Sequence, residues 1–91
     1  MSESQAEPSV EQAVEELRKL DVGDVLVSSA SMLASLAYGK LAPELRDLDQ
    51  ARLAIDALRV LVPVLPEEHR RAIQDVLTNL QLAYADAAKG E

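Results

Sequence analysis

The chain of 91 residues contains no cysteine, no tryptophan and no phenylalanine, and it has only one histidine and two tyrosines. The absence of cysteine excludes disulfide bonds, thiolate metal sites and a cysteine nucleophile, and it is typical of a reducing compartment. The scarcity of aromatic rings argues against stacking on nucleic acid bases. We therefore expect a cytoplasmic protein that does not bind nucleic acid directly.

Basic residues are scarce as well. The chain has nine Lys and Arg residues and sixteen Asp and Glu residues, which gives a net charge of −7. A protein that neutralises a phosphate backbone needs clustered cations, and no such cluster is present. The acidic excess is concentrated in residues 1–24. This stretch is either a solvated surface or a docking surface for a basic protein, and both interpretations stay open.

Long hydrophobic runs are also missing. The longest apolar segment, VLVSSASMLASLAYG at residues 25–39, contains four serines and is shorter than the roughly 20 residues that a membrane span needs. The opening residues MSESQAEPS lack the basic and apolar regions of a secretory signal. We expect no membrane association, a disordered acidic tail over residues 1–8 and a single helical domain over residues 9–91.

Apolar residues recur at spacings of three and four along the whole domain, and no segment alternates as a strand does. Ser9 with Gln12 predicts a capping box, and Asp24 is a good N-cap. Either Asp47 with Gln50 or Asp49 alone caps the third helix, and Pro63 should end that helix near residue 62. The sequence therefore predicts an all-α chain of four helices joined by short loops, at about 9–21, 24–41, 48–62 and 66–89.

The apolar surfaces of these helices differ in width. The first and last helices carry narrow stripes, whereas those at 24–41 and 48–62 are apolar over much wider arcs than four short helices can cover. Each large apolar side chain left exposed forgoes roughly 1.5 to 3 kcal/mol, so we predict a symmetric helical dimer. The alternative is that the serines face water. The predicted self-association interface consists of Ser28, Ser31, Met32, Ser35, Tyr38 and Gly39.

Residues suited to catalysis are few. His69 is the only histidine, it lies among charged residues in the first turn of the last helix, and no Ser or Asp accompanies it at a catalytic spacing. The carboxylates are scattered along polar faces rather than gathered at metal-ligand spacings. We therefore predict no catalytic residue, no metal site and no cofactor, and we interpret His69 as a solvated side chain.

Three segments resemble a known family: LDVGDVLVSSASMLASLAYGKL at 20–41, DLDQARLAIDALRVL at 47–61 and VLTNLQLAYADA at 76–87. In type and order they are similar to the small helical bacterial proteins of domain-of-unknown-function family 1844, in its actinobacterial-type branch. The similarity covers about residues 20–88, and the connection between the last two helices is short and proline-rich. The resemblance implies no established activity, cofactor or catalytic residue. Genes of such proteins often lie beside those for an initiation factor and ribosomal proteins, which implies a link to translation.

Two functions follow as hypotheses. The first is a non-catalytic, self-associating helical module that binds protein. The alternative is a translation-linked accessory factor that contacts a ribosome-associated protein through charge.

Overall fold

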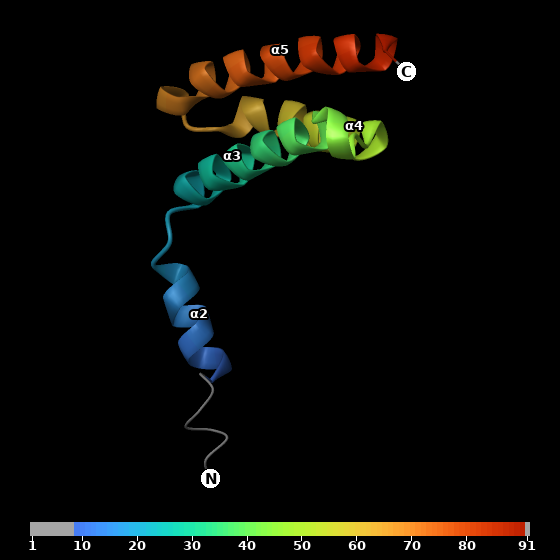
Figure 1. Cartoon of the computed structure of the whole chain (residues 1–91). Helices are drawn as coiled ribbons and strands as arrows, with labels where there is room; N and C mark the ends of the chain where they lie inside the picture. The colour runs from blue at the N-terminus through green and yellow to red at the C-terminus, as the bar shows by residue number, and fades with distance from the viewer. Residues whose placement is uncertain (1–8, 91) are drawn as a thin grey trace.

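The computed structural model describes residues 9–90, and within that range all regular structure is helical. The four α-helices are α2 (Val10–Arg18), α3 (Val22–Leu41), α4 (Leu48–Leu61) and α5 (Glu67–Lys89), as Figure 1 shows. Two short 3-10 turns, η1 (Pro43–Leu45) and η2 (Val62–Val64), lie on either side of α4. The prediction of an all-α chain with four helices is confirmed. The predicted tail at 1–8 lies outside the described residues.

Two helix starts follow the predicted side-chain chemistry. The backbone N–H of Gln12 donates to Oγ of Ser9 at 3.1 Å, and the Ser9 N–H donates to Oε1 of Gln12 at 3.1 Å. This capping box satisfies donors that the first turn of α2 leaves free. At the start of α4, the N–H of Gln50 donates to Oδ1 of Asp47 at 3.1 Å, so Asp47 is the N-cap.

Two predicted boundaries are wrong by two or three residues, and the others lie within one residue of those in the structure. Helix α3 begins at Val22 rather than at 24, because Asp21 caps it by accepting a hydrogen bond from the Asp24 N–H at 3.0 Å. Helix α5 begins at Glu67, because Pro66 has an extended backbone and occupies the cap position instead of the first helical position. Helix α2 ends at Arg18, three residues earlier than expected.

Proline and arginine shape the helix ends. Ala42 is extended before Pro43, which ends α3, and α4 ends at Leu61 where η2 brings in Pro63. Arg46 Nε donates to the carbonyl of Leu41 at 3.1 Å. Arg70 Nη2 likewise donates to the Leu65 carbonyl at 2.9 Å. Both bonds satisfy carbonyl groups in the connections, where regular helix pairing stops.

Helices α3, α4 and α5 pack against one another and form the body of the protein. Its centre holds the fully buried side chains of Leu58, Leu65 and Leu80. Helix α3 contributes mainly alanines to this core, and their small side chains let the neighbouring helices come close. The buried residues of α3 are Ala30, Ala34, Ala37 and Leu41. They occupy one side of α3, so the chain itself covers this helix on that side only.

Helix α2 lies apart from the body. None of its residues is buried, and residues 19–21 connect it to α3 so that it projects away, as Figure 1 shows. The narrow apolar stripe of α2 has therefore found no neighbour within the single chain.

Candidate interaction surface

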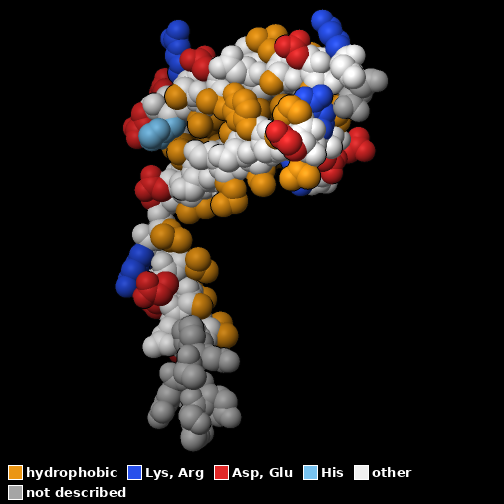
Figure 2. All heavy atoms as spheres, in the orientation of Figure 1, with side chains coloured by type: hydrophobic (Ala, Val, Ile, Leu, Met, Phe, Trp, Pro, Cys, Tyr) orange, Lys and Arg blue, Asp and Glu red, His pale blue; other side chains and the backbone are white. Residues whose placement is uncertain are grey.

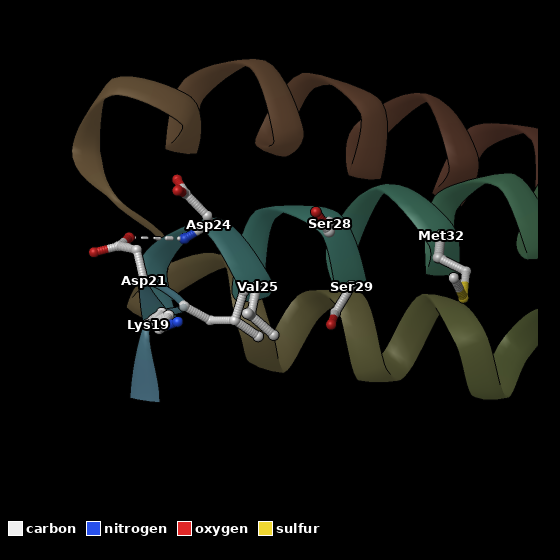
Figure 3. A pocket seen from close by; sticks show the side chains of 8 residues that line it. Lys19, Asp21, Asp24, Val25, Ser28, Ser29 and Met32 are labelled. Atoms are coloured by element: carbon white, nitrogen blue, oxygen red, sulfur yellow. Dashed lines mark hydrogen bonds between the residues drawn. The ribbon is translucent and has the colours of Figure 1, made fainter. Parts of the chain in front are cut away.

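Large apolar side chains remain exposed along one side of α3. They are Val25, Met32 and Leu36, and the side chain of Met32 is 66% exposed. Since the spacings between them are seven and four residues, they share one side of the helix. Figure 3 shows Val25 and Met32 extending to the same side of α3 together with Ser29. This exposed stripe lies away from the alanines that α3 presents to the core.

The stripe continues onto α4 and η1. A groove between the helices is lined by Leu36 of α3 and Leu53 of α4, and Val60 follows Leu53 two turns later on the same side of α4. A second groove brings Leu45 of η1 next to Met32 and Leu36. We call the combined surface the apolar face, and its exposed members are Val25, Met32, Leu36, Leu45, Leu53 and Val60.

All six residues of the predicted interface are exposed on α3, but they do not form one strip. Met32 and Gly39 lie within the apolar face, and Ser28 and Ser35 lie along its edge. Helical geometry places Ser31 and Tyr38 about 100 to 120° away from Met32, on a separate strip. The structure thus shows that all six residues are exposed, and the self-association interface that they were predicted to form stays a prediction.

A groove at the bend between α2 and α3 borders the same surface. It is lined by Lys19, Leu20 and Asp21 of the connection and by the first three turns of α3 as far as Met32. In Figure 3 the carboxylate of Asp21 is engaged with the backbone of Asp24 and so holds the first turn of α3. The walls of this groove combine apolar side chains with serine hydroxyls. A helix with a mixed apolar and polar surface fits such a lining.

Helix α2 carries the remaining exposed apolar stripe. Val10, Val14 and Leu17 recur on one side of the helix, and Leu20 extends the stripe into the connection. In Figure 2 hydrophobic side chains of α2 lie on the inner side of the bend, below the hydrophobic side chains on the underside of α3. The stripe of α2 and the apolar face therefore border the same concave side of the molecule.

Charged groups lie at the margins of the apolar face. Lys40 is half-buried, lines both the α3–α4 groove and the groove beside Leu45, and makes no ion pair within residues 9–90. On α4, Asp56 lies 3.9 Å from Arg52 and 3.6 Å from Arg59. These pairs are exposed and contribute little to stability. Lys40 is thus the cation best placed to meet an acidic partner at the face.

The described part of the chain offers no arrangement suited to metal chemistry. Among residues 9–90, no group of three or more His, Cys, Asp or Glu side chains is placed to hold a metal ion. His69 lies exposed in the first turn of α5, with Nε2 3.5 Å from Oε2 of its neighbour Glu68. The arrangement of side chains that stands out is therefore the apolar face.

By length and composition α3 could also cross a membrane, and only 17% of its most apolar 18-residue stretch is buried. Core helices of soluble proteins meet the same criteria, so one such helix is weak support for a span. The neighbours of α3 argue against it, since α4 packs beside α3 and carries Arg52, Asp56 and Arg59 on its exposed side. Charged side chains are costly within the hydrocarbon layer.

Comparisons with protein-family models, with curated proteins and with solved structures return no match to this chain. The resemblance to family 1844 thus stays a prediction.

Several parts of the surface were not included in the predicted interface, among them Val25, Leu36 and Leu45 of the apolar face. Another is the contribution of α4, although the wide apolar arc that includes Leu53 and Val60 already indicated that this helix is two-sided. A further part is the stripe of α2. Its apolar periodicity is present in the sequence, but the position of α2 apart from the body depends on tertiary packing. Ser29 was also missed, since it lies beside Val25 and Met32 on the exposed side.

Proposed function

We propose that the chain is a self-associating helical module that acts in the cytoplasm by binding protein rather than by catalysis. The observation that carries this proposal is the apolar face, which runs across α3, η1 and α4 and is uncovered in the single chain. Five of its members line connected grooves: Val25 shares one with Met32, Met32 and Leu36 share one with Leu45, and Leu36 shares one with Leu53. These residues therefore form one surface rather than isolated exposed residues. Contiguous surfaces of this kind mark sites where proteins associate.

The energetics favour a partner over water. Leaving a Leu, Val or Met exposed forgoes roughly 1.5 to 3 kcal/mol per side chain, and the apolar face has six such residues. A second copy of the chain brings an identical face, which a two-fold axis can set against the first. Gly39 supports close approach, because its backbone lies in the face without a side chain and a Cβ there would touch nothing within 4 Å.

Light scattering on the purified protein at micromolar concentration tests the proposal. We expect a mass twice that of the 9.9 kDa chain. Leu53→Glu places a charge in the apolar face and should give a monomer. Leu82→Glu is the matched control, since Leu82 lies on α5 and both leucines are 63% exposed.

A monomer mass for the wild-type protein at all concentrations up to the solubility limit would contradict self-association. Loss of the dimer in Leu82→Glu as well as in Leu53→Glu would leave self-association standing but would contradict the assignment of the contact to the apolar face, because any added charge would then disrupt it. Flotation with lipid vesicles tests the remaining alternative, in which a membrane covers the apolar face, because a membrane-bound chain would rise with the vesicles.

A further inference from the structure

The detached helix α2 identifies what covers the apolar face. We propose that α2 of one chain packs onto the apolar face of a second copy, and that the second chain returns the same contact. This exchange of α2 deepens the proposed self-association and rests on it. It assigns a partner segment to the face, namely the stripe formed by Val10, Val14, Leu17 and Leu20.

The first argument is the length of α2. It has only nine residues, and isolated helices shorter than about 12 to 15 residues are marginal in water. Its capping box helps, whereas the pair between Arg18 and Glu15 at 2.9 Å is exposed and contributes little. Helix α2 therefore needs a surface to pack on, and its own chain leaves all of its residues exposed.

The second argument is the fit between the two surfaces. The stripe from Val10 to Leu17 is about 10 Å long, and the part of the apolar face from Val25 to Leu36 is about 16 Å long. A short helix can thus lie within the face. Lys40 borders the face, while Glu11 flanks the stripe and makes no ion pair within residues 9–90. Glu11 of one chain and Lys40 of the other are therefore of opposite charge, and both lack an ion pair within residues 9–90 of the single chain.

The third argument concerns which copy supplies the helix. In Figure 2 the stripe of α2 and the hydrophobic underside of α3 border one concave side, so a second molecule seated there touches both. The Asp21 cap fixes the first turn of α3, and the connection leads α2 away from its own face. Under two-fold symmetry each α2 then reaches the face of the other chain.

Cross-linking between different chains tests the exchange directly, because the wild-type protein has no cysteine. One chain carries Leu17→Cys and a second, of different mass, carries Leu53→Cys. The two are mixed, allowed to exchange and treated with a short bismaleimide. Each chain has a single thiol, so a product joining residues 17 and 53 can form only between chains. We expect this product at several-fold higher yield than with Leu82→Cys in place of Leu53→Cys.

Variants of α2 give a second measurement. In a two-fold dimer the Leu17 side chain is buried twice, so Leu17→Glu should raise the dimer dissociation constant by at least about a hundredfold. Leu82→Glu should leave it within a few-fold. Helix content from circular dichroism, compared with that of Leu82→Glu, shows whether the body has kept its fold.

The outcomes separate the exchange from self-association itself. A wild-type monomer would overturn both. A dimer that survives Leu17→Glu, with no link between residues 17 and 53, would overturn the exchange and leave the apolar faces packed directly on each other. A chain carrying both cysteines that links only within itself would show that α2 folds back onto its own face, which also overturns the exchange.

Discussion

A Cβ atom placed on Gly23 of α3 would lie 2.9 Å from Cγ of Pro66, the cap residue of α5. Real Cβ atoms do not approach a ring carbon so closely, so the glycine allows the first turn of α3 to pack against the connection between η2 and α5. The relationship joins two segments that lie far apart in the sequence. It also explains why a glycine is found inside the first turn of a helix.

Replacement of Gly23 by alanine should therefore destabilise the fold. Overpacking costs about 1 to 3 kcal/mol, whereas the better helix propensity of alanine returns at most about 1 kcal/mol. We expect a lower thermal midpoint and a smaller free energy of unfolding in urea. A midpoint equal to or above that of the wild type would show that Pro66 moves aside without cost.

The two aspartates at the start of α3 give a second prediction. Asp21 accepts the hydrogen bond of the cap, so Asp21→Ala should lower the free energy of unfolding by about 1 kcal/mol. Asp24 lies inside the first turn, where a carboxylate interacts only with the helix dipole, so Asp24→Ala should cost about 0.3 to 1 kcal/mol and less than Asp21→Ala. Urea unfolding of both variants measures the difference, and the reverse order would place the cap at Asp24.

These positions show what the sequence can and cannot predict. Ser9, Asp47 and Pro63 act through neighbours within a few residues, so their effects on helix boundaries were predictable. Asp21 and Asp24 are both good caps three residues apart, and the sequence predicted Asp24. The hydrogen bond that Asp21 accepts puts Gly23 inside the helix, and the contact with Pro66, which depends on tertiary packing, explains why this position is a glycine.

The candidate surface likewise has some features that the sequence predicts and others that depend on tertiary packing. Helical periodicity alone gives the angles between the small residues of α3, and it already separates Ser31 and Tyr38 from Met32. Which of these strips stays uncovered depends on which side the core takes, and the buried alanines decide it. The separation of α2 could not be predicted, since its stripe is typical of any helix with one neighbour.

Two leucines of α4 should respond differently to truncation. Leu58 is fully buried, so Leu58→Ala should lower the free energy of unfolding by about 2 to 5 kcal/mol at any protein concentration. Leu53 is exposed in the single chain, so Leu53→Ala should lower the thermal midpoint only at protein concentrations where the dimer forms. The size of this decrease should grow with concentration. Thermal unfolding over a hundredfold range of concentration separates them. A concentration-independent loss in Leu53→Ala would place Leu53 in the core instead.

Gly39 allows a test of close approach between the two chains. It lies within α3, where glycine is less favourable than alanine by up to about 1 kcal/mol, and a Cβ there meets no atom within 4 Å. In the monomeric Leu53→Glu background, Gly39→Ala should therefore raise the free energy of unfolding by about 0.5 to 1 kcal/mol. In the otherwise wild-type chain the added methyl group should weaken the dimer, because it occupies space that the partner uses. Urea unfolding measures the first effect and the concentration dependence of light scattering measures the second. If Gly39→Ala stabilises the monomer and leaves the dimer unchanged, the two chains meet elsewhere on the apolar face, toward Leu53 and Val60.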